Sequence, residues 1–454
     1  MNIIVVGGGK VGREIIASLC QEGHNISFID HDPAVVEELT SDFDILGVCG
    51  SGVTITTLEQ AGIKGSDLLI ATTNMDEINV LACVIARRLG TKGTIARVRD
   101  PDTYSQVHFM REGLGVSMMV NPEYTTAREI SRMLRIPSAT HEESFAKGRI
   151  DMVEFIIPEG SPIAGTALKD MHTKLDGARV LICAVQRKDS DEAVIPGGDF
   201  VINEGDRIHL SASHDQISLF LRRVGIVKNK IRDVMIIGGG RISYYLSQML
   251  VDSGMSVKII EKDHDRCEML SQKLPKVRII HGDGANQELL MEEGLDETDA
   301  CIALTDIDED NIIMSMYANM HTCPKVILKI NSSDLQKMSA SVGLESSVSP
   351  KELTADIILS YVRALEETTG GVIRSMYKLV GGQVEAMEFW ATGDGKAIGV
   401  PLAKLQTKKE LLIAGILRDG KIMFPGGSDA ILSGDVVIVV TKNRFITSLD
   451  QILE

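Results

Sequence analysis

Glycines spaced for phosphate binding stand near the start of the chain. Gly7, Gly9 and Gly12 have the spacing G-x-G-x-x-G and follow an apolar run that predicts a buried strand. In such a loop the first glycine permits a tight turn, and the second lets a pyrophosphate approach the backbone. The third lets the next helix, predicted over 11–20, pack closely on the strand, and the free N–H groups at its start attract the phosphates. The predicted phosphate loop comprises Gly7, Gly8, Gly9, Lys10, Val11 and Gly12.

An acidic residue accompanies this loop at the end of the next predicted strand, 25–30. Asp30 stands where dinucleotide-binding domains place the carboxylate that binds the ribose hydroxyls. A carboxylate repels a 2′-phosphate, and His31 and Asp32 follow rather than an arginine. The sequence therefore favours NAD(H) over NADP(H). The alternative is a glycine-rich turn that binds no nucleotide, and the accompanying acid makes it less favoured.

Polar residues follow the predicted strand 67–72. Ligands of open parallel sheets bind outside the carboxyl ends of the strands, so Thr73 and Asn74 are placed to reach the nucleotide. A second role for Asn74 and Asp76 is to cap the helix that begins near Ile78, and this role is compatible with the first.

Arg97 lies in an otherwise apolar strand, predicted over 93–98. A buried guanidinium group needs an anionic partner. A nucleotide phosphate or a carboxylate of the chain would supply it, and the sequence alone leaves both open.

The second half of the chain repeats this pattern. Gly7 corresponds to Gly238, Asp30 corresponds to Glu261, and the run 67–79 corresponds to 299–311. Ser243 replaces the third glycine, and Lys262 follows the acid, so the second site is the weaker match. The candidate residues of the second site are Gly238, Gly239, Gly240, Arg241, Ile242, Glu261, Thr305, Asp306 and Lys329.

Each half alternates strand and helix patterns for about 120 residues, which is typical of a doubly wound parallel sheet. Short strands with turn residues follow and predict a small α+β module. The fold class is thus α/β, with two Rossmann-like domains each followed by such a module. We expect domains at 1–135, 141–225, 231–365 and 372–454, with linkers near 136–148, 225–231 and 366–383.

A helix predicted over 121–135 leaves the first sheet. Its apolar residues Ile130, Met133 and Leu134 recur at helical spacing. They form either internal core or a subunit interface.

Composition excludes several classes of protein. The 454 residues carry a formal net charge of −16, which argues against nucleic-acid binding and against docking on anionic lipid. No apolar run reaches the ~20 residues that a membrane helix needs. The chain starts with a strand pattern and no basic region, so we expect no signal peptide.

We expect neither a metal site nor a catalytic site. The seven cysteines show no C-x-x-C pair, and most lie in apolar runs, which is typical of reduced core thiols. His172, His209 and His214 are scattered and do not form an acid–base set beside a substrate-binding arginine. The competing hypothesis is an NAD-dependent oxidoreductase with a duplicated cofactor domain, which would consume NADH.

The glycine loop with Asp30, the run 58–63, the run 67–79 ending in Asp76-Glu77-Ile78-Asn79, and the strand around Arg97 resemble one family. The chain is similar over essentially its whole length to the TrkA family of Trk-system potassium uptake proteins. That family is built from tandem RCK (regulator of K⁺ conductance) domains. The Asp-Glu-x-Asn run is the most specific element of the resemblance.

The resemblance implies a cytoplasmic subunit, peripheral on the membrane, that binds NAD(H) or adenine nucleotides such as ATP and ADP. It implies control of a Trk-type potassium-translocating membrane subunit, and a homotetramer that forms a ring of RCK domains. A regulator of another channel or transporter is an alternative. By the same resemblance the helices from Asn121 and from Pro350 are crossover and hinge helices, which favours the interface role for the apolar residues of the first.

Overall fold

The computed structural model describes residues 1–106, 113–135, 141–146, 149–225, 231–365, 371–393, 395–444 and 446–454. The chain divides into two compact units. One contains residues 1–131 and 231–355, and the other contains residues 132–230 and 356–454. Each unit therefore combines a segment from the first half of the chain with the matching segment from the second half.

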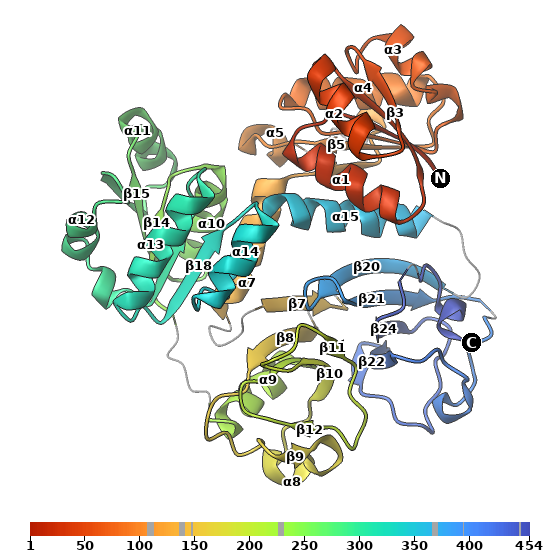
Figure 1. Cartoon of the computed structure of the whole chain (residues 1–454), viewed down its shortest axis with the longest axis vertical. Helices are drawn as coiled ribbons and strands as arrows, with labels where there is room; N and C mark the ends of the chain where they lie inside the picture. Colours follow the sequence, from red (N-terminus) through yellow and green to blue (C-terminus); the bar gives the residue numbers. More distant parts are fainter. Residues whose placement is uncertain are drawn as a thin grey trace. The chain divides into compact units, whose positions relative to one another are not determined.

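The first Rossmann-like domain begins the chain (Figure 1). Its sheet has the strand order β3-β2-β1-β4-β5-β6, and all neighbouring strands are parallel. This is the strand order of dinucleotide-binding domains, with the switch point between β1 and β4. Its strands are β1 (Asn2–Val6), β2 (Asn25–Asp30), β3 (Leu46–Cys49), β4 (Leu68–Ala71), β5 (Gly93–Arg97) and β6 (Met118–Val120). Its helices are α1 (Lys10–Gln21), α2 (Pro33–Asp42), α3 (Ile55–Gln60), α4 (Asp76–Arg88), α5 (Pro101–Ser105) and α7 (Pro122–Arg135).

The second Rossmann-like domain repeats this topology, with the parallel strand order β16-β15-β14-β17-β18-β19. Its strands are β14 (Asp233–Ile237), β15 (Ser256–Glu261), β16 (Arg278–His281), β17 (Ala300–Ala303), β18 (Lys325–Lys329) and β19 (Ser347–Val348). Its helices are α10 (Arg241–Asp252), α11 (His264–Lys273), α12 (Gln287–Glu292), α13 (Asp308–Met320), α14 (Ser333–Ser341) and α15 (Pro350–Leu365). The expected duplication of a doubly wound parallel sheet is confirmed.

The central strands are apolar along their whole length because helices cover both faces of each sheet (Figure 1). All four residues of β4 and all four residues of β17 are buried. This burial fixes the register of the strands, and it thereby fixes where each strand ends and where the loops that follow it lie.

The small modules share one strand order. The first has β7-β8-β13-β10-β11 and the second has β20-β21-β24-β22-β23. The first module contains β7 (His141–Phe145), β8 (Ile150–Ile156), β9 (Thr166–Ala167), β10 (Leu181–Gln186), β11 (Ala193–Val194), β12 (Val201–Ile202), β13 (Arg207–Ala212), α8 (His172–Leu175) and α9 (His214–Arg223). The second contains β20 (Gly371–Leu379), β21 (Val384–Ala391), β22 (Leu411–Arg418), β23 (Lys421–Met423) and β24 (Val436–Thr441). Buried apolar residues of both modules form one core cluster.

Two of the expected linkers are wrong in part. Strand β20 lies inside the segment 366–383, and β7 lies inside 136–148. Glycines at 370–371 and 381–382 suggested a linker, but Gly371 is the first residue of a strand that pairs with β21 along its length, and Gly381 and Gly382 follow that strand. The remaining residues of the segments 136–140, 147–148, 226–230 and 366–370 lie outside the described residues.

Ile130, Met133 and Leu134 on α7 are buried within a single chain. The residues that cover them therefore belong to the chain itself. Among the described residues, no helix combines the length and the apolar composition that a membrane span requires.

Candidate functional site

The first glycine loop turns sharply between β1 and α1. Gly7 has a φ of +99°, and a Cβ atom there would lie 2.9 Å from the backbone nitrogen of Thr73. A Cβ atom on Gly12 would lie 1.9 Å from the carbonyl oxygen of Gly7. Both glycines are therefore required by the packing of the loop itself.

Gly9 is different, because a Cβ atom there would meet nothing within 4 Å. Gly240, at the matching place in the second loop, is equally open. Packing inside the protein does not explain these two glycines. Their missing side chains leave the backbone accessible at the start of α1 and of α10, as the close approach of a pyrophosphate requires.

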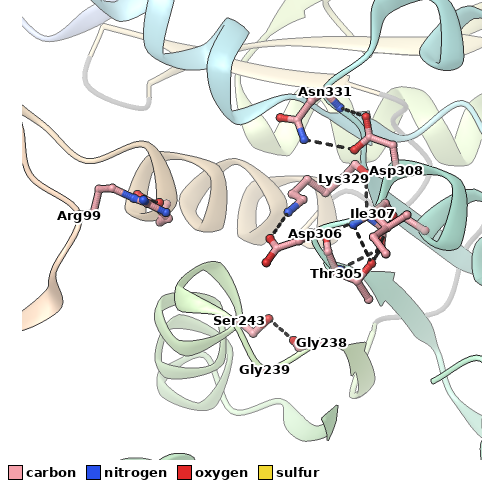
Figure 2. A network of polar contacts seen from close by, with 12 residues as sticks. Arg99, Gly238, Gly239, Ser243, Thr305, Asp306, Ile307, Asp308, Lys329 and Asn331 are labelled. Atoms are coloured by element: carbon pink, nitrogen blue, oxygen red, sulfur yellow. Dashed lines mark hydrogen bonds and ion pairs between the residues drawn. The ribbon is translucent and has the colours of Figure 1, made fainter. Parts of the chain in front are cut away.

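The second loop accommodates a side chain at the third glycine position. The Oγ atom of Ser243 donates to the carbonyl oxygen of Gly238 at 2.5 Å (Figure 2). The loop begins as the first one does, since Gly238 has a φ of +98°. The departure from the glycine pattern is therefore absorbed by a hydrogen bond inside the loop.

The two acids at the ends of β2 and β15 hold their glycine loops. The Oδ2 atom of Asp30 accepts from the N–H group of Gly8 at 2.7 Å, and its Oδ1 atom accepts from Asp32 at 3.0 Å. Glu261 accepts from the N–H group of Gly239 at 2.6 Å. A carboxylate has further lone pairs, so these bonds leave Asp30 able to accept from a ribose hydroxyl.

Thr73 takes part in a buried clamp at the end of β4. Asn79, which is fully buried on α4, accepts from both the N–H group and the hydroxyl of Thr73 at 2.8 Å. The amide of Asn79 donates to the carbonyl oxygens of Thr73 and Arg97. Asn311 makes the same contacts with Thr305 and Lys329. Sequence reasoning found the Asp-Glu-x-Asn run but not this role, which ties β4 to β5 and β17 to β18.

The expected helix cap is wrong. Met75 is the N-cap residue of α4, and no side chain caps this end of the helix. The carboxylate of Asp76 instead accepts from the N–H groups of Arg99 and Asp100, both at 2.8 Å. Asp308 binds the backbone after β18 in the same way (Figure 2). These acids hold the chain just beyond β5 and β18.

Arg97 lies at the end of β5 with its Nε atom buried and without a hydrogen-bond partner. Its one described hydrogen bond runs from Nη1 to the carbonyl oxygen of Thr72, at 3.4 Å. Burial, and then the nearby charge of Arg99, lower the pKa of Arg97, and Arg241 of the second domain adds to this effect. Among the described residues Arg97 forms no ion pair, although the charges of Glu123 and Asp76 act against the lowering of its pKa, and the Oε1 atom of Glu123 is paired with Arg99 at 2.5 Å.

Lys329 occupies the matching position of the second domain and has a partner. Its Nζ atom lies 3.2 Å from Asp306, as Figure 2 shows. Asn331 stands where the first domain has Arg99. The second site therefore presents less uncompensated positive charge than the first.

One cavity of about 1170 Å³ joins the two glycine loops. The predicted residues that line it are Gly7, Gly9, Lys10, Val11, Asp30, Thr73, Asn74, Arg97, Gly239, Gly240, Arg241, Ile242, Asp306 and Lys329. The predicted residues that do not line it are Gly8, Gly12, Gly238, Glu261 and Thr305. Sequence reasoning missed several charged and aromatic residues of the lining, namely Arg99, Glu123, Tyr244, Arg266, Lys273 and Lys351.

Side chains of the two Rossmann-like domains meet beside this cavity. The amide of Asn121, just before α7, donates to the hydroxyl of Tyr245 on α10 at 2.9 Å. On the other side, Lys351 on α15 lies 2.8 Å from Glu14 on α1. The repeat places Tyr245 and Glu14 at matching positions. Their partners Asn121 and Lys351 lie two positions apart in the aligned repeat, so the two crossings are similar in place and different in chemistry.

Comparison with known proteins also finds the duplication of the Rossmann-like domain. The family model of the TrkA-N domain matches residues 3–122 and 234–350, and that of the TrkA-C domain matches residues 152–225. The chain is similar over nearly its whole length to a structure described as the "GsuK channel bound to NAD", with a TM-score of 0.63 at 17% identity. The likeness covers 99% of this chain and 77% of that one. A structure described as the GsuK RCK domain gives a TM-score of 0.63 at 18% identity, covering 99% of this chain and 93% of that one.

Curated relatives match from end to end. The "Trk system potassium uptake protein TrkA homolog 2" of Methanosarcina mazei is 30% identical, with 100% of both chains covered. The TrkA protein of Halomonas elongata is 29% identical over 100% of this chain and 99% of its own length. From the glycine loops, the repeated domains and these full-length matches, we conclude that the chain belongs to the TrkA family of Trk-system potassium uptake proteins.

Proposed function

We propose that this chain is a nucleotide-binding regulatory subunit of a potassium uptake system. The observation that carries the proposal is the single cavity lined by both glycine loops. A nucleotide bound at either loop contacts a cavity whose walls come from both Rossmann-like domains. Binding can therefore favour one arrangement of the two domains over another. Relatives along the whole chain are named as potassium uptake proteins, which supports potassium as the transported ion.

The ligands of the two loops are NAD(H) or adenine nucleotides. Solved structures with the same fold are described as GsuK bound to NAD and to ADP. The open backbone at Gly9 fits a pyrophosphate, and the buried Nε atom of Arg97, which has no hydrogen-bond partner, fits a phosphate. We assign the nineteen residues named from the sequence to these two sites. Those that line the cavity serve as contacts, and Gly8, Gly12, Gly238, Glu261 and Thr305 hold the loops in shape.

Regulation then follows as a population shift. A ligand that binds one arrangement of the domains more tightly moves the protein toward that arrangement by its difference in affinity. Pro122 at the start of α7, and Pro350 and Lys351 at the start of α15, line the cavity. The nucleotide therefore contacts the helices that lead out of the two sheets, and these helices transmit the change.

The assembly is a homotetramer on the cytoplasmic face of the membrane, attached to a Trk-type potassium-translocating subunit. The support is family membership, because relatives along the whole chain are named as Trk-system potassium uptake proteins and the resemblance implies such an assembly. The four domains fall at 1–135, 141–225, 231–365 and 372–454. The competing function, an NAD-dependent oxidoreductase, is not favoured by the comparisons, because relatives that match along the whole chain are named as potassium uptake proteins.

The test compares Asp30→Ala and Gly9→Val with the wild-type chain. A Cβ atom at Gly9 meets nothing within 4 Å, so we expect the variant to fold while its side chain excludes the pyrophosphate. We expect each variant to weaken NADH or ADP binding by at least about tenfold, the effect of losing one charge-assisted or backbone contact to the ligand. Both should also blunt nucleotide control of potassium flux when the protein is reconstituted with its membrane subunit.

Unchanged flux control in a variant that has lost binding contradicts the regulatory function. The same titration separates the enzyme hypothesis. A regulator returns NADH unchanged, whereas steady NADH consumption by the wild-type chain that Gly9→Val abolishes would establish an oxidoreductase instead.

A further inference from the structure

We propose that the second site selects a nucleotide whose ribose carries a 2′-phosphate, the class of NADP(H), while the first site selects the unphosphorylated class of NAD(H). This inference rests on the proposed nucleotide binding and assigns different ligands to the two sites. The observations that carry it lie around the acid at the end of β15 and on the first turns of α11.

The acid of the second site is withdrawn from the cavity. Both oxygens of Glu261 accept from backbone N–H groups, Oε2 from Gly239 at 2.6 Å and Oε1 from Asp263 at 2.8 Å. Its side chain is 5% exposed and does not line the cavity, whereas Asp30 does line it. Asp30 makes the same two backbone bonds, so the difference between the two acids is that Asp30, 10% exposed, borders the cavity and Glu261 does not.

An arginine stands beside this withdrawn acid. The Nη1 atom of Arg266 lies 3.6 Å from Glu261, which offsets the carboxylate charge, while the arginine side chain stays 45% exposed and lines the cavity. A guanidinium group has five donors, so this one pairing leaves several for a phosphate. In NADP-binding Rossmann domains, an arginine near the ribose acid accommodates the 2′-phosphate.

The first site lacks this arginine. The residue five positions after Asp30 is Val35, and the residue five positions after Glu261 is Arg266. Val35 also lines the cavity, so the two side chains occupy matching places at the two ligand sites. An apolar side chain beside a carboxylate that lines the cavity favours a free ribose hydroxyl, and the apolar side chain offers nothing to a phosphate.

Charge along the rest of helix α11 differs in the same direction. Lys273 lines the cavity and is 42% exposed, and the matching residue of α2 is Asp42. Asp42 is paired with Arg13 at 3.1 Å. Lys273 lies 3.5 Å from Asp102, whose side chain is largely exposed, so solvent screens that pair. The helix beside the second site therefore carries as many basic as acidic side chains, whereas its counterpart carries acidic side chains alone.

The experiment measures binding of adenosine 2′,5′-bisphosphate and of AMP to the full chain by calorimetry. These two probes differ only in the 2′-phosphate. We expect the wild-type chain to bind the bisphosphate at one site at least about tenfold more tightly than AMP, as one charge-assisted contact provides. Arg266→Val, which installs the residue of the first site, should remove this preference. Arg266→Lys should keep part of it.

The matched control is Asp30→Ala. It should weaken NADH binding at the first site and leave the affinity for the bisphosphate at the second site unchanged. A bisphosphate preference that survives Arg266→Val, or equal binding of both probes by the wild-type chain, overturns the inference. In either case Asp30-dependent NADH binding can persist, so failure here is distinguishable from failure of the proposed function.

Discussion

Arg97 in the first Rossmann-like domain points its charge toward the cavity without an acidic partner, whereas Lys329 at the same place in the second is paired with Asp306. At the other end of the sites the difference is reversed, because Arg266 in the second domain replaces Val35 in the first. Positive charge therefore gathers at opposite ends of the two sites.

The backbone supports of the two sites are nearly identical. Asn79 and Asn311 make the same hydrogen bonds, and Asp76 and Asp308 hold the same loop segments. Comparison of the two domains thus separates the residues that build a nucleotide-binding loop from those that choose its ligand. The residues that build the loop hydrogen-bond to backbone N–H and carbonyl groups, and the residues that select the ligand present side chains to the cavity.

The largest effect is expected from substituting a residue that supports the backbone of a loop. Asn79→Ala leaves buried polar groups of Thr73 and Arg97 without partners, and Asn311→Ala does the same to Thr305 and Lys329. We expect each change to destabilise its domain by about 3 kcal/mol. Urea unfolding of each full-length variant measures the loss. A large loss in one variant with none in the other would show that the two clamps are not equivalent.

The second effect tests the one backbone difference between the loops. Gly12→Ala places a Cβ atom against the carbonyl oxygen of Gly7, so the loop must shift, at a cost of about 2 kcal/mol. Ser243→Gly in the second loop removes only the hydrogen bond to Gly238, and we expect it to lower the free energy of unfolding by about 1 kcal/mol. Thermal unfolding compares the two. Equal losses would mean that the second loop depends on its serine as the first depends on its glycine.

The third effect concerns Arg97 and Lys329, the residues expected to contact the phosphates. Arg97→Gln should weaken ADP binding at the first site by about tenfold, because a charged partner for phosphate is lost. Unfolding of the ligand-free protein should show a loss of only about 1 kcal/mol or less, since the guanidinium group makes one long hydrogen bond, to Thr72, and no ion pair within the described residues. Lys329→Gln should change ADP binding less, because Asp306 already offsets its charge. Calorimetric titration measures the ADP affinity of both variants. A larger loss of affinity in Lys329→Gln than in Arg97→Gln would contradict this prediction.

The smallest effect tests the two crossings between the domains. Tyr245→Phe removes the buried hydrogen bond with Asn121, and we expect the free energy of unfolding to fall by about 1 kcal/mol. Glu14→Gln weakens a partly exposed ion pair with Lys351, and we expect the free energy of unfolding to fall by about 0.5 kcal/mol or less. The readout is the change in NADH affinity at the first site when the second site is filled. If neither variant alters that change, the crossings hold the domains together without coupling the sites.

Much of this site follows from local spacing. The glycine loops, the acids after the second strand of each repeat and the parallel sheets are set by short patterns of apolar and small residues, and their places were predicted from them. The role of Asp76 was predicted wrongly as a helix cap, because a carboxylate at a helix start is equally able to bind a neighbouring loop, and only the distance to the backbone of Arg99 decides. The linker over 366–383 failed because glycines mark strand ends as well as linkers.

By itself, the sequence determined the duplication, the fold class and which residues belong to each glycine loop, because these depend on spacing along the chain. Only the tertiary structure decided which charges are paired, since pairing depends on distances between elements far apart in sequence. Arg97 and Lys329 occupy equal positions in the repeat, yet one lacks an acidic partner and the other meets Asp306. The joining of both loops in one cavity is likewise a property of packing between two domains, which no local pattern encodes.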